Sequence, residues 1–175
     1  IRAAEEEPGY THVEHAMARA SWTVQDHLDG AYGIDRLGGA NAALCALGRY
    51  RVDDPVRMTA QVKRAAQLYG AVLTGVAPVD RRWIYRVDRQ GRPVEVPDAL
   101  TWAVVMAIPM DVQSLMATPD QVAAAATGAG YSRMAMAASS LAQFIRGLGY
   151  CALAMGNDTA LSIPLAVDAG LGRLG

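Results

Sequence analysis

The chain has 175 residues, of which 52% are hydrophobic and 19% are charged, and this composition predicts one globular domain with a buried core. Sixteen basic against seventeen acidic residues give a net charge of -1, which argues against a nucleic-acid-binding surface and against an acidic tail. Glycines and Arg133 interrupt the alanine-rich stretch after Val122, so no apolar run reaches the ~18 residues of a membrane span. The chain begins at Ile1 without a secretory signal after it, and we expect it to be a piece of a longer protein.

The first half of the chain predicts two helices. Apolar residues at three- and four-residue spacing predict a helix over residues 12–27, with a stripe made of Val13, Met17, Ala20 and Val24. Four glycines then predict a loop, namely Gly30, Gly33, Gly38 and Gly39. A second helix is expected to begin at Pro55, with Asp54 as its N-cap and Gly70 as its stop. Its apolar stripe consists of Met58, Val62, Ala65, Ala66 and Tyr69.

The second half predicts strands that alternate with helices. Residues 71–77 and 101–108 are short and apolar and predict two buried strands, with a long polar surface excursion between them. Thr118-Pro-Asp-Gln121 has the pattern of a capping box, which predicts a helix from Pro119 to about Leu148. A third short strand is expected over residues 150–154 and a last helix over residues 162–169. The fold class is therefore α/β or α+β.

Cysteines and histidines form no metal site of recognisable spacing. Cys45 and Cys151 stand among apolar neighbours, and we interpret both as buried small hydrophobic residues. Two cysteines cannot supply the four thiolates of an iron–sulfur cluster. His12 and His15 could share one face of a helix and hold a metal. No third ligand stands at helical spacing, so we expect them on a solvated helix surface instead.

Polar residues interrupt the long alanine-rich helix at Tyr131-Ser-Arg133. Small residues surround this point: Thr127, Gly128, Ala129, Gly130 and Ala135. A helix with so little side-chain bulk would let a wide, flat group approach its backbone. The small residues could equally serve close helix packing, with Tyr131 as a residue at the rim. Spacing alone leaves both interpretations open.

A second polar cluster, Met155-Gly-Asn-Asp-Thr-Ala-Leu-Ser162, follows the expected third strand. Polar residues at the carboxyl end of a strand bind ligands in open α/β sheets, although they can also form only a turn and an N-cap. The glycines of Ala169-Gly-Leu-Gly172 follow a helix and lack the G-x-G-x-x-G spacing, so they do not predict a dinucleotide site.

In order and spacing, several of these segments resemble the reductive dehalogenases. The matching segments are Gly70-Ala-Val-Leu-Thr-Gly-Val-Ala-Pro78, Gly130-Tyr-Ser-Arg-Met134, Leu148-Gly-Tyr150, Gly156-Asn-Asp-Thr159, Pro164 and Ala169-Gly-Leu-Gly172. Ala20-Ser-Trp-Thr-Val24 and Arg82-Trp-Ile-Tyr85 resemble the respiratory, exported branch in particular. Epoxyqueuosine reductases share the corrinoid core, but their characteristic acid does not stand at the position of Tyr131.

The resemblance implies a cobalamin-binding core with a nitroreductase-like fold. Residues 51–175 would form the first part of this core, and residues 1–50 an N-terminal segment of helix and loop. By the resemblance, Tyr131 is the proton donor and Asn157 faces the substrate beside it. Residues implied to bind the cobalamin (cobamide) are Gly156, Asp158, Thr159, Ser162, Gly170 and Gly172. A phenol with a pKa of about 10 is a weak acid at neutral pH, so a nearby cation should assist it. The family's cation would lie beyond Gly175, and Arg133 is expected on another face of the helix.

Two 4Fe-4S clusters are also implied in the family, but this chain has no C-x₂-C-x₂-C-x₃-C-P run to bind them. We therefore expect no turnover driven by a protein electron donor in these 175 residues alone. The implied partners are a small organohalide and an electron-donor protein or membrane anchor, and a homodimer remains open. Family members of this branch lie on the outer face of the cytoplasmic membrane, while a cytoplasmic location stays open without a signal. Two alternatives remain: a non-catalytic corrinoid-binding or cofactor-handling module of the same fold, and a flavin-binding nitroreductase-like protein.

Overall fold

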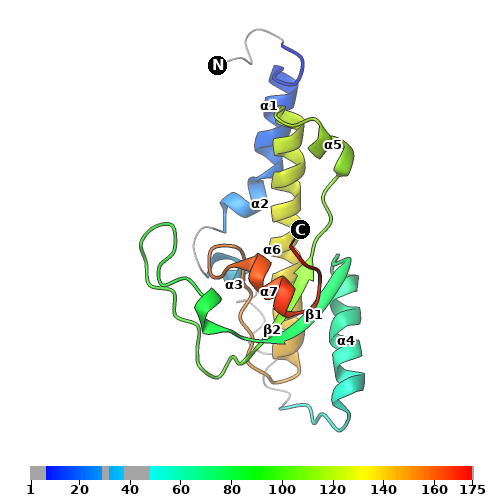
Figure 1. The fold of residues 1–175 in the computed structure, drawn as a ribbon, viewed down its shortest axis with the longest axis vertical. Coiled ribbons are helices and arrows are strands. Elements are labelled where there is room, and N and C mark those ends of the chain that lie inside the picture. Colours follow the sequence, from blue (N-terminus) through cyan, green and yellow to red (C-terminus); the bar gives the residue numbers. More distant parts are fainter. Residues whose placement is uncertain (1–6, 29–31, 38–47, 175) are drawn as a thin grey trace.

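The computed structural model describes residues 7–28, 32–37 and 48–174. Its central element is the long helix α6 (Gln121–Gly147), which runs through most of the molecule (Figure 1). Helix α1 (His12–Ser21) packs along the first half of α6, and a small sheet and α4 (Pro55–Leu68) lie beside its second half. The other elements are α2 (Thr23–Asp26), α3 (Gly33–Arg36), β1 (Leu73–Pro78), a 3-10 helix (Arg81–Trp83), β2 (Trp102–Ala107), α5 (Val112–Met116) and α7 (Ser162–Asp168).

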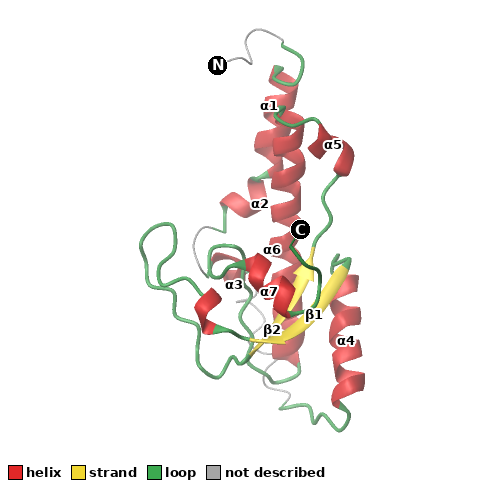
Figure 2. Ribbon diagram, in the orientation of Figure 1, coloured by secondary structure: helices red, strands yellow, loops and turns green. Residues whose placement is uncertain are grey.

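The sheet consists of β1 and β2, which pair antiparallel with Leu73 opposite Ala107 and Pro78 opposite Trp102 (Figure 2). Both strands lie where the sequence predicts them, and residues 79–101 form the predicted excursion between them. The prediction that the strands are buried is wrong, because β2 has no fully buried residue and Leu73 and Trp102 are exposed at opposite ends of the two-stranded sheet. Mixed helix with an antiparallel sheet makes the described chain α+β, not α/β.

Helix α4 agrees with its prediction in every part. The carboxylate of Asp54 accepts hydrogen bonds from the amides of Val56 and Arg57, Pro55 occupies the first turn, and Gly70 follows with a φ of 108°. The predicted stripe is the face that packs, and Ala66 in its centre is fully buried.

Two predictions for the N-terminal helix are wrong. Residues 12–27 form two helices, α1 and α2, because the chain turns at Trp22. The buried face of α1 centres on Ala18, whereas Val13 and Met17 of the predicted stripe are exposed. The physical reason is the close approach of α1 to α6 on the face of Ala18 and Ser21, where a Cβ on Gly128 would be 2.3 Å from Ser21 Oγ. In addition, Gly33 begins the short helix α3 instead of a loop, and the buried Ile34 anchors it. Gly30, Gly38, Gly39 and Cys45 lie outside the described residues.

The predicted capping box of α6 is also wrong, although the helix itself is confirmed. Asp120 is the N-cap and makes no side-chain capping bond. The amide of Gln121 instead donates to the carbonyl of Gly9 at 2.8 Å, so a distant segment satisfies the start of the helix. The end is as predicted, with Gly149 at a φ of 80° directly after the C-cap.

A third strand over residues 150–154 does not form among the described residues. Side chains form hydrogen bonds with the backbone groups of this segment that would otherwise pair with a neighbouring strand. The amide of Ala154 donates to Asp35 at 2.8 Å, and the carbonyl of Ala152 accepts from the Arg146 guanidinium at 2.8 Å. Cys151 is consequently exposed and not buried, which corrects its predicted environment. The last helix, α7, is confirmed, and its end lies so close to β1 that a Cβ on Gly75 would be 2.3 Å from the Ala169 carbonyl oxygen. Within the described part of the chain, none of the helices has the length and hydropathy needed to cross a bilayer.

Candidate functional site

Tyr131 stands midway along α6, where α1 ends. Its ring stacks on the indole of Trp22, with ring centroids 5.3 Å apart and planes at 26°. Trp22 can lie against α6 because residue 128 is glycine: a Cβ there would be 2.3 Å from Ser21 Oγ and 2.6 Å from the Trp22 ring. The hydroxyl of Ser132 also donates to the Ser21 carbonyl at 2.8 Å. The turn at Trp22 is thereby fixed against the middle of α6.

The small residues of α6 serve close packing, which was one of the two interpretations of the sequence. At Gly128 the flat group that approaches the helix is the indole of Trp22. Further along, Ala135, Ala138 and Ala142 form the main core with Leu28 and Ile34. Arg133 is exposed and its Nε donates to the Ala129 carbonyl, so it lies on a different face from Tyr131 as expected.

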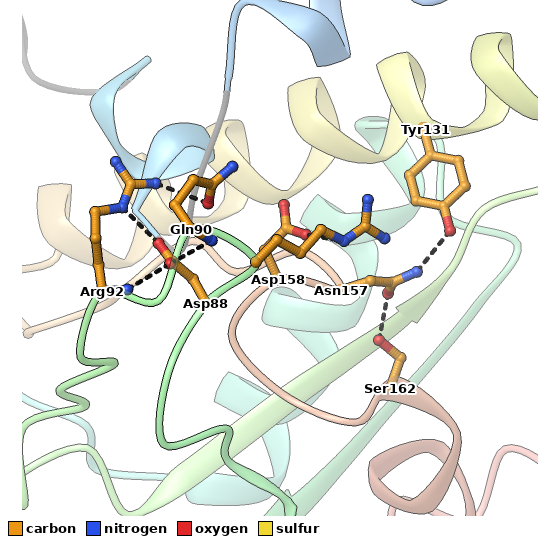
Figure 3. Close-up of polar contacts among 8 residues, drawn as sticks. Asp88, Gln90, Arg92, Tyr131, Asn157, Asp158 and Ser162 are labelled. Atoms are coloured by element: carbon orange, nitrogen blue, oxygen red, sulfur yellow. Dashed lines mark hydrogen bonds and ion pairs between the residues drawn. The ribbon is translucent and has the colours of Figure 1, made fainter.

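Asn157 meets Tyr131 from the opposite side, although 26 positions separate them in sequence. The Nδ2 of Asn157 donates a hydrogen bond to the phenol oxygen of Tyr131 at 2.9 Å (Figure 3). The hydroxyl of Ser162 donates to Oδ1 of the same amide at 2.5 Å. The sequence prediction that Asn157 approaches Tyr131 is therefore confirmed.

The chain of three side chains has a defined direction. The Ser162 hydroxyl donates to Oδ1 of Asn157, and the amide nitrogen of Asn157 points toward Tyr131. The phenol oxygen then acts as an acceptor, and its own hydrogen is not used in this contact. Among the described residues, no acceptor binds that hydrogen, so the arrangement leaves the phenol free to donate into the adjoining space.

The segment that carries Asn157 is held by a half-buried ion pair. Nη2 of Arg146 contacts both carboxylate oxygens of Asp35 at 2.7 Å, and both side chains are about four-fifths shielded from solvent. The same carboxylate binds the Ala154 amide, three residues before Asn157. Further on, the carbonyl of Thr159 accepts from the Tyr85 amide at 3.0 Å, which ties the turn to the excursion after β1.

A hairpin over residues 87–93 brings the cationic side chain of Arg89 beside Asp158, the residue that follows Asn157. The carboxylate of Asp88 accepts from the amides of Gln90 and Arg92 and from Nε of Arg92, at 2.7–2.9 Å (Figure 3). Burial raises the pKa of Asp88, but these hydrogen bonds and the Arg92 charge outweigh burial and hold its pKa below the ordinary value. Arg89 at the tip of the hairpin lies with its Nε 3.6 Å from an oxygen of Asp158.

Two cavities meet at Asn157. The first, of about 410 Å³, is lined by Trp22, Tyr131 and Asn157, and by the polar residues Gln25, Asp26, Arg89 and Asp158. We call it the Tyr131 cavity. The second is a groove of about 240 Å³ between β2, the second half of α6 and residues 151–157, and its walls are almost entirely apolar. Asn157 and Ser162 are among its few polar residues. Trp22, Gln25 and Arg89 were not predicted as site residues, because no local pattern brings them near Tyr131.

The predicted cofactor-binding residues divide into two groups. Gly156, Asp158 and Thr159 lie in or next to the turn beside Tyr131, with Thr159 fully buried and Asp158 paired to Arg89, and Ser162 begins α7. Gly170 and Gly172 follow α7 and line neither cavity, and a Cβ at either would meet no atom within 4 Å.

Metal-ligating side chains do not gather into any group of three within the described ranges. His12 is exposed, in agreement with its prediction. His15 is half-buried beside the Tyr10 ring, with centroids 6.4 Å apart, so the prediction of a solvated surface holds for only one of the pair.

The known proteins that are similar to this chain include three reductive dehalogenases. It is 28% identical to a tetrachloroethene reductive dehalogenase of Dehalobacter restrictus, over 97% of this chain and 44% of the relative. The corresponding protein of Desulfitobacterium hafniense is 27% identical over the same shares, and that of Sulfurospirillum multivorans is 32% identical over 69% of this chain and 30% of its own length. No protein-family model matches the chain.

The names of these relatives define a class of oxidoreductases, the reductive dehalogenases. The chain belongs to the reductive dehalogenase family. It spans less than half the length of the relatives it matches. Two of the alignments extend over 240 residues, more than the 175 residues of this chain, so those relatives carry additional residues within the matched stretch.

Proposed function

We propose that this chain forms part of the catalytic subunit of a cobamide-dependent reductive dehalogenase, with Tyr131 as the proton donor. Converting a carbon–halogen bond to a carbon–hydrogen bond and a halide ion requires two electrons and one proton. A reduced cobamide would supply the electrons when bound. The observation that carries the proposal is the hydrogen bond from Asn157 to the phenol oxygen inside a cavity, which leaves the phenol hydrogen available for transfer.

Asn157 would serve the reaction without adding charge. When the phenol gives up its proton, its oxygen becomes negative, and the amide of Asn157 already donates to that oxygen at 2.9 Å. This hydrogen bond strengthens as charge develops and so favours the transfer. Ser162 would act as a positioning residue, because its hydroxyl hydrogen-bonds the Asn157 amide from the side opposite Tyr131.

The described residues fit a cobamide as one wall of its site. The groove beside Asn157 is apolar and open, which suits the face of a flat macrocycle, and it begins at the two polar residues Asn157 and Ser162. Residues proposed to hold the cofactor are Gly156, Asp158, Thr159, Ser162, Gly170 and Gly172. Thr159 is fully buried and would contribute through the shape of the turn, while Gly170 and Gly172 have open space where a Cβ would stand.

The larger framework is proposed on the family relationship. Residues 51–175 would form the first part of a nitroreductase-like, corrinoid-binding core, and residues 1–50 an N-terminal segment of helix and loop. Two 4Fe-4S clusters and an electron donor would belong to other parts of the whole protein, since the two cysteines here cannot ligate a cluster. The substrate would be a small organohalide, and export to the outer face of the cytoplasmic membrane is inferred from the same relationship.

The test compares Tyr131→Phe with the wild type, using protein loaded with cobalamin and reduced by titanium(III) citrate. We expect the wild type to dehalogenate slowly and the variant to lose about 100-fold or more in rate, as for removal of a general acid. Tyr150→Phe is the matched control, because Tyr150 donates to the Tyr50 carbonyl far from the cavity. Dehalogenation that survives in Tyr131→Phe removes the tyrosine from the mechanism. Cobalamin binding, read from the visible spectrum, without any dehalogenation would favour the non-catalytic corrinoid-binding module.

A further inference from the structure

Helix α4 carries a cationic surface that has no acidic partner among the described residues. Its 14 residues include Arg57, Lys63 and Arg64 and contain no aspartate or glutamate. Six other arginines each form an ion pair with an aspartate, whereas these three cations are exposed and form none within the described ranges. Cations that gather on one helix without counter-charges attract a partner of negative charge.

The cations of α4 point away from the core. The packed face of the helix centres on the buried Ala66. Arg57, Gln61, Arg64 and Leu68 follow one another at helical spacing on the opposite face, and all four are exposed. The helix lies at the edge of the molecule, with its inner side toward the sheet and α6 (Figure 1). We call these four exposed residues the α4 ridge.

The carboxyl end of the α4 ridge is apolar. Leu68 is 81% exposed, and Val72 and Leu73 in the segment directly after α4 are 55% and 52% exposed. Large apolar side chains that gather on a surface mark a contact with a partner or with a membrane. Basic residues beside exposed apolar ones are typical of a helix in a membrane interface, where cations meet the headgroups and apolar side chains enter below them.

The shape of the α4 ridge favours an extended partner. None of its residues lines either cavity, so it presents a convex surface and not a pocket for a small anion. Seven residues of helix separate Arg57 from Arg64, which places their Cα atoms about 10 Å apart along the ridge. A plane of closely spaced phosphates can contact both ends of such a ridge at once.

We propose that the α4 ridge binds the anionic phospholipid headgroups of a bilayer surface. Arg57, Lys63 and Arg64 pair with lipid phosphates, and Leu68 enters the interface beside them. The chain itself contacts the lipid here, which differs from attachment through an anchor protein. The inference does not depend on the proposed function, because none of these residues lies at the Tyr131 cavity.

Sedimentation of the full chain with vesicles at low salt measures this binding. Vesicles that contain phosphatidylglycerol should bind the wild type, and vesicles of phosphatidylcholine alone should not. Each cation near an anionic surface strengthens binding about fivefold, so Arg64→Glu, which changes the charge by two units, should weaken it about 30-fold. Arg64→Lys keeps the charge and should bind as the wild type does. Leu68→Ser should weaken binding about tenfold through lost apolar contact.

The matched control is Arg86→Glu, which makes the same change in net charge at another exposed arginine. Arg86 belongs to the excursion after β1, which lies across the molecule from α4 (Figure 1). Binding should weaken much less in this variant, and circular dichroism should show that both variants keep the helix content of the wild type.

Four results would overturn the proposal. Absence of wild-type binding to phosphatidylglycerol vesicles leaves the α4 ridge as a solvated face, and this result needs no variant to fold. Equal weakening by Arg64→Glu and Arg86→Glu assigns binding to net charge alone. Unchanged binding of Leu68→Ser contradicts insertion into the interface. Binding that inorganic phosphate abolishes at constant ionic strength assigns the α4 ridge to a free phosphate and not to a bilayer.

Discussion

Tyr131 and Asn157 are hydrogen-bonded to each other in the wall of one cavity, yet different forces position them. Tyr131 stands on α6, a 27-residue helix whose small residues pack closely on α1 and on the core. Asn157 stands on a segment without regular hydrogen-bonded structure, and the hairpin with Arg89 lies beside it. One side of the site is fixed by packing and the other by the carboxylates of the half-buried Asp35 and the buried Asp88.

The carboxylates replace what a sheet would otherwise provide. Asp35 binds the Ala154 amide and Arg146, and Asp88 binds two amides and Arg92 within its own hairpin. A packed helix resists displacement through many weak contacts, whereas each loop depends on one side chain. Single substitutions on the two sides of the cavity should therefore have clearly different effects on stability.

The largest effect is expected from Asp35→Ala. The change leaves Arg146 without its bidentate carboxylate and the Ala154 amide without its acceptor. We expect the free energy of unfolding to fall by about 3 kcal/mol, measured by urea denaturation. Asp53→Ala is the matched control, since its pair with Arg51 is largely exposed and should be worth less than about 1 kcal/mol. Equal effects of the two substitutions would mean that Asp35 does not organise the segment.

Two glycine-to-alanine changes in α6 are expected to change the free energy of unfolding in opposite directions. Alanine is the better helix former by about 1 kcal/mol, and at Gly147 an added Cβ meets no atom within 4 Å, so Gly147→Ala should stabilise by up to that amount. At Gly128 the added Cβ would be 2.3 Å from Ser21 Oγ, and we expect Gly128→Ala to destabilise by about 2 kcal/mol. Thermal unfolding of both variants measures the signs. Stabilisation by both would show that α1 is not held against α6 at this point.

The difference between the two sides also explains how far the sequence could predict them. Helix α4, both strands and the length of α6 follow from local patterns such as Asp54-Pro55 and Gly149, whose effects act within a few residues. The start of α6 was mispredicted because its first amide is bound by Gly9, more than 100 residues away. The absent third strand has the same cause, since Asp35 takes the Ala154 amide over a distance of 119 positions.

For the site, residue types indicated Tyr131 and Asn157, and the resemblance to a family paired them. The pairing could not come from spacing, because it depends on how residues 151–157 are held. Trp22 was placed within a helix, and its turn against Gly128 depends on the shape of α6. Gln25 and Arg89 had no local signal, because nothing in their own neighbours indicates a cavity.

Asp88→Asn should loosen the hairpin with a smaller effect on global stability than the two preceding changes, because the hairpin is mostly exposed. The pKa of Asp88 is lowered in the folded state, so its contribution is present above the unfolded value of about 3.9 and is lost as pH falls through the folded pKa. We expect the amides of Gln90 and Arg92 to be protected from hydrogen exchange to the same degree between about pH 5 and 8. This protection should be lost below about pH 4. In Asp88→Asn the protection should be weak throughout. A protected hairpin in the variant would contradict the role of the carboxylate.

The smallest effect is expected at the tip of the same hairpin. Arg89 and Asp158 lie 3.6 Å apart, and the Arg89 side chain is 81% exposed, so water and salt screen the pair. Arg89→Gln should change the free energy of unfolding by less than about 0.5 kcal/mol, in contrast to the half-buried pair of Asp35 and Arg146. Urea denaturation at low and high salt provides the measurement, and the small difference between variant and wild type should vanish at high salt. A loss comparable with that of Asp35→Ala would contradict this view, because it would require Arg89 to be part of the structural framework of the cavity. A negligible loss leaves Arg89 free to move with the contents of the cavity, as a side chain that faces exchanging ligands must.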